Sequence, residues 1–270
     1  MPDDHHLDTM ATVATRLEVV AIEVAQEAAA MVRDAAKRVR TLRTKSTPTD
    51  VVTQLDVEAE TLIRDLLTDR VPGSALAGEE LEDHAGTSSI GWVIDPIDGS
   101  VNLLYGVPIV AVSIGATFEG TIVAGAVCDV FRGETYSGAA GKGARLDGEK
   151  IGTGSDRELS QSLLATGYSY DAALRERQGE EVHGLLPLVR DIRSFGSAAL
   201  HLSWVACGRI DGYFERNLAH WDYAAGGLVA REAGAFVELP NDANGGLTLA
   251  SAPGIFQELK QILSARPLVS

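Results

Sequence analysis

Two aspartates and the residues beside them offer the chemistry of a combined metal and phosphate site. Asp95 and Asp98 stand three residues apart, directly after the apolar run 92–94, which reads as the buried end of a strand. Their carboxylates are hard oxygen ligands of the kind that suits Mg²⁺. Gly99 and Ser100 follow and could open a helix, whose first backbone N–H groups lack helical acceptors and suit a phosphate. The stretch therefore places candidate metal ligands beside a candidate anion site, as metal-assisted phosphoryl transfer requires.

A second interpretation of this stretch is a strand that ends in an ordinary Asp-Gly turn, in which Asp98 only shapes the backbone. The complete string at 95–102, Asp-Pro-Ile-Asp-Gly-Ser-Val-Asn, favours the first interpretation. It closely resembles the Asp-Pro-Ile-Asp-Gly-Thr-x-Asn signature of the inositol monophosphatase family of Mg²⁺-dependent, lithium-sensitive phosphatases, in its bacterial inositol-1-monophosphatase type. Position 100 is serine where the family usually has threonine, so the hydroxyl is kept and a methyl group is lost.

Two further strings extend the resemblance. Gly-Glu-Glu at 78–80 precedes the aspartates and is similar to the family's metal-binding Gly-Glu-Glu, although an acidic run of this kind is usually a solvated loop. Trp-Asp-Tyr-Ala-Ala-Gly at 221–226 resembles the family's Trp-Asp-x-Ala-Ala-Gly. Taken alone, Asp222 would be the N-cap of a helix. Taken together, the three strings indicate that Glu79 and Asp222 join the aspartates at one site.

The resemblance implies a set of roles for residues of this chain. It implies two or three Mg²⁺ ions, with Asp95 bridging two of them, and the implied ligands are Glu79, Asp95, the backbone carbonyl of Ile97, Asp98 and Asp222. The Ser100 hydroxyl, hydrogen-bonded to Glu79, would position the attacking water, and the backbone N–H groups of Gly99 and Ser100 would hold the phosphate. Asp50 would face the metals through water as a further catalytic residue, and an N-cap of the following helix is an equally open role for it.

The alcohol part of the substrate is expected on the C-terminal half of the chain. By resemblance, the residues that contact an inositol ring are Asp98, Gly196, Ser197, Ala198, Glu215 and Asp222. The expected activity is hydrolysis of a myo-inositol monophosphate to myo-inositol and phosphate. Related substrates remain open: fructose 1,6-bisphosphate, histidinol phosphate or phosphoadenosine phosphate. A regulatory binding protein with residual phosphatase activity is a further alternative, which the intact set of four carboxylates disfavours.

Charge and composition indicate which binding partners and which compartment to expect. The formal net charge of the 270 residues is −15, which argues against nonspecific binding to nucleic acid or to an anionic membrane and leaves a small phosphate ester as the expected partner. Cys128 and Cys207 form no Cys-x-x-Cys pair and are expected to be free thiols in a reducing compartment. The N-terminus lacks the basic and apolar regions of a signal peptide, so we expect a cytoplasmic protein, with a homodimer implied by the resemblance.

Hydrophobic patterning predicts the elements that position these residues. Apolar residues at three- and four-residue steps predict a long helix over 9–39, and a second helix follows the loop 45–50. The β-branched runs 110–118 and 121–130, joined at Glu119-Gly120, predict a hairpin. Further strands are predicted at 163–166, 192–195, 212–215, 235–238 and 247–250, and further helices at 198–207, 223–233 and 255–263.

These elements predict an α+β fold with an α/β part. An antiparallel sheet flanked by the two N-terminal helices would form one lobe at 8–155, and a smaller α/β lobe would occupy 156–270 within the same domain. The family resemblance implies that the layers alternate as αβαβα. Residues 1–7 are expected to form a disordered tail.

Overall fold

The structure is a computed structural model that describes residues 4–36, 41–44, 51–154 and 157–265. The candidate catalytic residue Asp50 lies outside these ranges.

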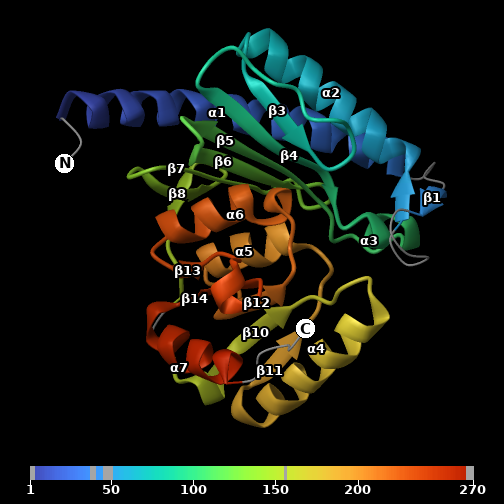
Figure 1. Ribbon diagram of the computed structural model, residues 1–270, viewed down its shortest axis with the longest axis vertical. Coiled ribbons are helices and arrows are strands. Elements are labelled where there is room, and N and C mark those ends of the chain that lie inside the picture. The colour runs from blue at the N-terminus through green and yellow to red at the C-terminus, as the bar shows by residue number, and fades with distance from the viewer. Residues whose placement is uncertain (1–3, 37–40, 45–50, 155–156, 266–270) are drawn as a thin grey trace.

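A seven-stranded sheet dominates the N-terminal lobe, and its strands lie side by side in sequence order. The first pair of strands is parallel, and every later pair is antiparallel. The strands are β3 (Ala75–Gly78), β4 (Ile90–Asp98), β5 (Ala111–Phe118), β6 (Thr121–Asp129), β7 (Thr135–Ala139), β8 (Gly143–Leu146) and β9 (Glu149–Ile151). Helices α1 (Asp4–Ala35) and α2 (Gln54–Arg70) cover one face of this sheet (Figure 1). Strands β1 (Thr41–Thr44) and β2 (Val51–Thr53) form a separate antiparallel pair.

The C-terminal lobe contains a five-stranded mixed sheet in the order β11-β10-β12-β14-β13. Strand β10 is parallel to both of its neighbours, whereas β14 is antiparallel to β12 and β13. The strands are β10 (Leu163–Thr166), β11 (Asp191–Arg193), β12 (Gly212–Arg216), β13 (Phe236–Glu238) and β14 (Leu247–Ser251). The helices after β4 are α3 (Ser100–Tyr105), α4 (Ala172–Leu185), α5 (Ala198–Ala206), α6 (His220–Glu232) and α7 (Pro253–Ser264), and the 3₁₀ turns are η2 (Leu159–Gln161), η3 (Leu186–Leu188) and η4 (Asp242–Asn244).

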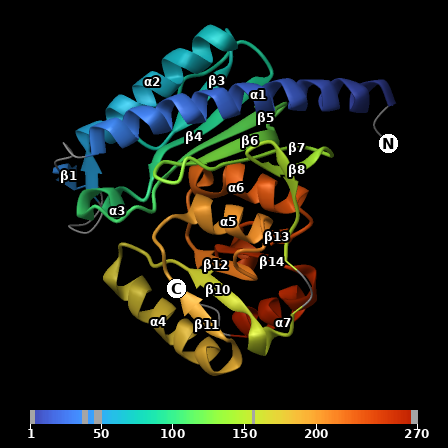
Figure 2. The same cartoon turned by 180° about the vertical axis from the view of Figure 1, so that it is seen from behind.

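The two sheets and the helices stack as five layers. Helices α5 and α6 lie between the sheets, and α4 and α7 cover the outer face of the smaller sheet (Figures 1 and 2). Three buried apolar clusters fill the spaces between these layers. The expected αβαβα fold is therefore confirmed. Among the helices that the described residues form, none is both long enough and apolar enough to cross a membrane.

The hairpin and most of the C-terminal elements fall where the sequence predicts them. Glu119 and Gly120 both have positive φ, 52° and 77°, as the two central residues of a tight hairpin turn require. The first helix differs, because it begins at Asp4 and ends at Ala35, so residues 4–7 belong to its first turns instead of to a disordered tail. Several short strands and 3₁₀ turns were not predicted, and α4 is the long helix of the described residues that the sequence pattern does not predict.

The failure to predict α4 has a physical cause. Two of the three side chains that this helix buries, Gln178 and Glu181, are polar, and Leu185 is the third. A helix whose inner face is polar has no apolar stripe, so hydrophobic periodicity cannot find it. Its start is marked instead by Asp171, whose carboxylate accepts hydrogen bonds from the N–H groups of Ala173 and Leu174, both at 2.9 Å.

Small residues allow α6 to approach the large sheet closely. A Cβ atom on Gly125 of β6 would lie 2.9 Å from the Cα atom of Ala225, and one on Gly115 of β5 would lie 3.2 Å from the Cβ atom of Ala224. On the other side of the helix, a Cβ atom on Gly226 would lie 2.9 Å from the Cβ atom of Leu202. The Ala-Ala-Gly part of the 221–226 string is therefore needed for packing, and it fixes the start of α6 against the sheet.

We expect Gly125→Ala to destabilise the protein, because the added methyl group meets the α6 backbone, which cannot move without shifting the whole helix. The cost should be about 1–3 kcal/mol of unfolding free energy, the usual penalty for overpacking a core. Gly179→Ala on α4 is the matched control: its added methyl group meets no atom within 4 Å. That variant should gain about 0.5–1 kcal/mol from helix propensity. Urea unfolding of both variants measures the difference, and equal stabilities would contradict the packing argument.

Candidate active site

A bulge at the end of β4 presents the two central aspartates. Asp95 pairs with Ser113 of β5 and Asp98 pairs with Ala111, with a shift in register between the two pairs. Three steps along β4 therefore match two steps along β5. Pro96 lies inside this bulge, where its missing N–H removes no regular ladder bond. The N–H of Ile97 donates to Asp95 Oδ1 at 3.0 Å, which fixes the orientation of the first carboxylate.

The residue after the bulge must be glycine. Gly99 has a φ of 103°, and a Cβ atom there would lie 2.9 Å from the Ile109 carbonyl oxygen and 3.2 Å from the Gly196 carbonyl oxygen. No residue with a side chain fits both the backbone conformation and the space. Helix α3 then begins at Ser100, as the sequence predicts.

The Ser100 hydroxyl has a different partner from the expected one. It donates to Asp56 Oδ1 at 2.5 Å and also lies 3.0 Å from the carbonyl oxygen of Ile97. The expected hydrogen bond to Glu79 is not among the contacts of Ser100 in the described part of the chain. Asp56 comes from α2 and is 1% exposed.

Asp56 is a functional candidate that the sequence analysis missed, although the sequence carries a signal for it. It lies beside Leu55 and three residues before Ala59, on the face of the predicted helix that should be apolar. A carboxylate on a buried face needs a polar partner and therefore marks a special role. Here the Ser100 hydroxyl is such a partner.

Glu79 is positioned by a buried carboxylate on α2. Glu60 is fully buried and accepts hydrogen bonds from the N–H groups of Glu80 at 2.7 Å and Leu81 at 3.3 Å. It packs so closely that a Cβ atom on Gly78 would lie 2.2 Å from Glu60 Oε1. The glycine of the Gly-Glu-Glu string is thus required by this contact. The turn that follows β3 is fixed, and Glu79 faces the cavity between the lobes.

Asp222 lies in the first turn of α6 but is not its N-cap. The cap position belongs to Ala219, whose N–H donates to Asp222 Oδ2 at 2.7 Å. The carboxylate also lines the same cavity as Glu79. The close packing of α6 on the large sheet therefore sets the position of this ligand candidate.

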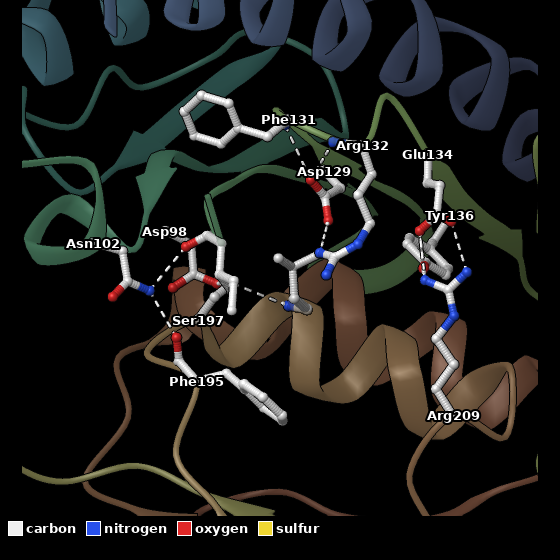
Figure 3. Close-up of polar contacts among 12 residues, drawn as sticks. Asp98, Asn102, Asp129, Phe131, Arg132, Glu134, Tyr136, Phe195, Ser197 and Arg209 are labelled. Atoms are coloured by element: carbon white, nitrogen blue, oxygen red, sulfur yellow. Dashed lines mark hydrogen bonds and ion pairs between the residues drawn. The ribbon is translucent and has the colours of Figure 1, made fainter. Parts of the chain in front are cut away.

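Asp98 bridges the two lobes. Its carboxylate accepts a hydrogen bond from the Ser197 hydroxyl at 2.5 Å and from the N–H groups of Ala199 at 2.7 Å and Ala198 at 3.3 Å, all at the start of α5 (Figure 3). Asn102 strengthens the bridge, because its Nδ2 atom donates to the Phe195 carbonyl oxygen at 2.7 Å. These groups of the C-terminal lobe hold the Asp98 motif in place.

The residues at the start of α5 that were expected to contact the substrate do not line the cavity. Ser197 is 2% exposed, and neither it nor Gly196 nor Ala198 is among the described residues that line the cavity. In the structure Ser197 and Ala198 donate hydrogen bonds to Asp98, and the Gly196 carbonyl oxygen accepts one from Asn102 Nδ2 at 3.4 Å. Glu215 does line the cavity, at the end of β12, and the Tyr213 hydroxyl donates to its Oε2 atom at 2.6 Å.

The cavity has a volume of about 320 Å³ and lies between the lobes. The N-terminal lobe contributes Glu79, Asp95, Ile97, Asp98, Gly99 and Ser100, and the C-terminal lobe contributes the segments 168–170 and 215–219 together with Trp221 and Asp222. Every metal-ligand and phosphate-binding candidate of the sequence analysis is therefore brought to one place. The segments 168–170 and 216–219 were not predicted, since they contain no acidic or histidine side chains and belong to no motif.

Burial and mutual repulsion make these carboxylates unusually basic. Burial, with the charges of Glu79, Asp98 and Asp222, holds the pKa of Asp95 well above its usual range. Burial raises the pKa of Asp98 to about 6, although the hydrogen bonds from Ser197 and the α5 backbone lower it. Burial also raises the pKa of Asp222, and the charges of Asp98 and Glu79 add to the effect. Such a cluster of acids favours a partner with positive charge.

The donors fit a hard divalent cation by type and charge. Among the described residues that line the cavity, Arg216 is the single base, and its guanidinium binds Glu181 at 2.7 Å. Carboxylate and carbonyl oxygens are the ligands that Mg²⁺ prefers. The carboxylates do not form a complete ligand cluster as they stand: within the described residues, no three acidic, histidine or cysteine side chains are gathered that closely. Asp95, Asp98 and Asp222 each accept backbone N–H groups instead.

Five alternating layers with an acid-lined cavity between two lobes define the inositol-monophosphatase type of fold. The sequence model of the Inositol monophosphatase family matches residues 13–266, and the chain belongs to this family.

Individual relatives agree with this assignment. An inositol-1-monophosphatase of Mycobacterium bovis is 46% identical over 267 residues, which cover 90% of this chain and 92% of that protein. The crystal structure of the extragenic suppressor protein suhB from Bartonella henselae matches with a TM-score of 0.82 and 33% identity, covering 90% of this chain and 96% of that chain. A Salmonella typhimurium protein named Nus factor SuhB is 39% identical over 190 residues, covering 70% of this chain and 71% of that protein.

The acidic cavity predicts a distinct dependence of stability on pH once metals are removed. Burial raises the pKa of Glu215 to about 7, against the hydrogen bond from Tyr213 and with the charge of Asp98. The pKa of this carboxyl is higher in the folded protein than in the unfolded protein. At pH values between these two pKa values, the folded protein therefore binds more protons than the unfolded protein. Stability therefore falls as the pH rises through that range.

In EDTA, we expect the unfolding free energy to fall between pH 5 and pH 7.5, and to fall less in Glu215→Gln. The difference should be about 1–3 kcal/mol, since each unit of pKa shift corresponds to about 1.4 kcal/mol. Glu180→Gln, at an exposed position on α4, is the control and should follow the unmodified protein. Urea unfolding at several pH values measures this. Parallel curves for Glu215→Gln and the unmodified protein would contradict the assignment of a buried, proton-retaining carboxyl.

Proposed function

We propose that the protein is a Mg²⁺-dependent phosphomonoesterase that hydrolyses a myo-inositol monophosphate to myo-inositol and phosphate. The observation that carries the proposal is the meeting of Glu79, Asp95, Asp98 and Asp222, from distant parts of the chain, in one cavity beside Ser100. Family membership supports the phosphatase activity. The name of the M. bovis relative supports the inositol phosphate substrate.

The metal ions would be held by the carboxylates and by one backbone group. The proposed ligands are Glu79, Asp95, the carbonyl of Ile97, Asp98 and Asp222. When bound, two or three Mg²⁺ ions would offset the charge of the phosphate and acidify water. The chain itself supplies a rigid, negatively charged cradle, because each ligand is fixed by a bulge, a buried turn or a helix start.

The phosphate and the attacking water would be placed by the start of α3. The backbone N–H groups of Gly99 and Ser100 would bind phosphate oxygens. The Ser100 hydroxyl donates its proton to Asp56, so its oxygen can accept a hydrogen bond from water and orient that water for attack. In this arrangement Asp56 is a positioning residue, and it takes the place that the sequence analysis gave to Glu79. Glu79 then acts as a metal ligand and as an acceptor for the proton that water loses.

The alcohol would lie against the C-terminal lobe. Glu215 supplies carboxylate oxygens that can accept hydrogen bonds from ring hydroxyl groups, and Asp98 and Asp222 line the same cavity. We propose that Ser197 and Ala198 contribute through Asp98 and that Gly196 contributes through Asn102. A hydroxyl group that leaves water without finding an acceptor costs about 1–3 kcal/mol, so the carboxylate can select a polyhydroxylated ring over a simple alcohol.

The alternatives to this function are hydrolysis of another phosphate ester and a regulatory binding role. Fructose 1,6-bisphosphate, histidinol phosphate and phosphoadenosine phosphate would use the same metals and phosphate cradle. A regulatory binding role is the alternative that the name Nus factor suggests for the Salmonella relative. The complete set of carboxylates favours catalysis, because a binding protein needs no such cluster. We further propose a cytoplasmic homodimer, in which Cys128 and Cys207, both free thiols, stay reduced.

Removal of a metal ligand tests the mechanism. Asp95→Asn or Asp222→Asn should lower phosphate release at least about a thousandfold, equivalent to ~4 kcal/mol of barrier. Activity of the unmodified protein should require Mg²⁺, and millimolar Li⁺ should inhibit it by competing as a small hard cation. The assay is phosphate release with and without Mg²⁺.

Two variants serve as references for this experiment. Asp242→Asn, at an exposed position in η4, should keep full activity. Asp56→Asn should lose about ten- to a hundredfold without a change in the Mg²⁺ concentration required, because it removes the orientation of Ser100 and no ligand. Near-normal turnover in a folded Asp222→Asn variant would refute the metal assignment.

Substrate choice is tested at Glu215. Glu215→Gln should lower kcat/KM for myo-inositol 1-phosphate about ten- to a hundredfold, from ~1.4–3 kcal/mol of lost transition-state binding. Glycerol 2-phosphate has no ring, and its hydrolysis should barely change. Equal losses on both esters would assign Glu215 to folding instead, and a strong preference of the unmodified protein for another phosphate ester would replace the substrate while leaving the mechanism intact.

A further inference from the structure

Two tyrosines that no motif accounts for line the cavity between the lobes. Tyr168 and Tyr170 follow β10, with Ser169 between them, and all three residues border the acidic cavity. The tyrosine side chains are 38% and 45% exposed. A single exposed tyrosine is ordinary on a protein surface, but two of them on one wall of a catalytic cavity supply a sizeable apolar area to a bound molecule.

The loop that carries these tyrosines is held at its central residue. The N–H of Ser169 donates to Gln178 Oε1 at 2.8 Å, and the Ser169 carbonyl oxygen accepts a hydrogen bond from Arg175 at 3.0 Å. Both partners lie on α4, and Gln178 is 3% exposed. The Nε2 atom of Gln178 is also buried and has no hydrogen-bond partner among the described residues, so the bond from Ser169 to Oε1 is the one that holds this side chain. Loss of a hydrogen bond to a buried polar atom is costly, so the contact constrains the position of the loop. The tyrosines therefore stand on a fixed backbone.

The same helix also holds the strand that carries Glu215. Glu181 of α4 binds the guanidinium of Arg216 at 2.7 Å, and both side chains are almost fully buried. Arg216 directly follows Glu215 on β12. The loop also runs close over the carboxylate, since a Cβ atom on Gly167 would lie 2.0 Å from Glu215 Oε2. One face of α4 thus fixes the tyrosines and the carboxylate relative to each other.

We propose that Tyr168 and Tyr170 form an aromatic wall that binds the C–H face of a cyclic polyol phosphate while Glu215 accepts its hydroxyl groups. The inference rests on the proposed function and deepens it. A cyclic polyol presents apolar C–H faces and a polar rim, and it therefore needs an aromatic surface beside a hydrogen-bond acceptor. Tyrosine suits this task because its ring is large and rigid and its hydroxyl can remain in water. Gln178 is then a positioning residue for the wall.

The wall is tested with Tyr168→Ala and Tyr170→Ala on two esters in Mg²⁺. For myo-inositol 1-phosphate, KM should rise about five- to thirtyfold while kcat changes less than about threefold, as expected when contacts made equally in ground state and transition state are lost. Glycerol 2-phosphate should change less than about twofold, because it offers no ring face. The Tyr→Phe variants keep the aromatic face and should stay within about threefold of the unmodified protein on both esters.

A matched control is available on the surface. Tyr105 at the end of α3 is 79% exposed and does not line the cavity, so Tyr105→Ala should leave both KM values unchanged. An equal effect of Tyr168→Ala on the two esters, or an effect of Tyr105→Ala as large as that of Tyr168→Ala, would overturn the proposal.

The positioning role is tested with Gln178→Met, which keeps the side-chain volume and removes the acceptor for Ser169. The KM for myo-inositol 1-phosphate should rise selectively, with glycerol 2-phosphate turnover and the melting temperature showing that the protein is folded and active. Glu180→Met, two residues further along α4 at an exposed position, should have no effect. A folded Gln178→Met variant with an unchanged ratio of the two KM values would overturn this role.

These assays separate failure of the aromatic-wall proposal from failure of the proposed phosphatase function. If the unmodified protein releases phosphate from neither ester, the proposed function fails. Calorimetric binding of myo-inositol in the presence of Mg²⁺ and inorganic phosphate then still tests the wall, since binding should weaken in Tyr168→Ala and persist in Tyr105→Ala. If the unmodified protein hydrolyses both esters and the alanine variants do not separate them, the wall fails and the phosphatase assignment stands.

Discussion

The burial of several like charges in one small space is the constraint on which the rest of this structure depends. Asp95 is 1% exposed and Asp98 is 8% exposed, and both share a cavity with Glu79 and Asp222. Left to themselves, such side chains would turn outward into water, where their repulsion is screened. Each is prevented from doing so by a separate backbone device. These devices are the β4 bulge, the turn over Glu60 and the start of α6, and each holds the backbone in a local conformation that keeps a carboxylate in place.

The two lobes are coupled because a buried carboxylate of the N-terminal lobe takes its hydrogen bonds from the C-terminal lobe. Asp98 belongs to the larger sheet, yet its hydrogen bonds come from the start of α5 in the other lobe. Asn102 bonds the same loop through the Phe195 carbonyl. A movement of one lobe against the other would break several bonds to a buried carboxylate at once, which is far more costly than breaking the same number at the surface. The cavity therefore has stiff walls on both sides.

Local signals in the sequence predict many of the elements and the Asp95–Asp98 stretch, whereas the order of the layers and the meeting of Glu79 and Asp222 with these aspartates were implied by the family resemblance. The hairpin at Glu119-Gly120 depends on a turn of two residues, and the string at 95–102 holds the bulge, the glycine and the helix start together. Asp56 was missed since its significance depends on Ser100, 44 positions away, and nothing near Asp56 in the sequence indicates that partner. Helix α4 was missed because its buried contacts are made by polar side chains. The residues at 196–198 were expected to contact the substrate, but the three-dimensional contacts place Ser197 and Ala198 on Asp98 and Gly196 on Asn102, outside the lining of the cavity.

The position of α6 has a consequence for the way the chain reaches its final state. The large sheet is built from strands that are neighbours in sequence, so it can form early through short-range contacts. Helix α6 comes about a hundred residues later and packs against the glycines of β5 and β6, which is a long-range contact. Asp222 sits in its first turn, so docking of this helix both closes the middle layer and delivers the last carboxylate. During synthesis the nascent chain would hold Glu79, Asp95 and Asp98 in a half-built lobe, and the four carboxylates would meet in the same step that completes the core.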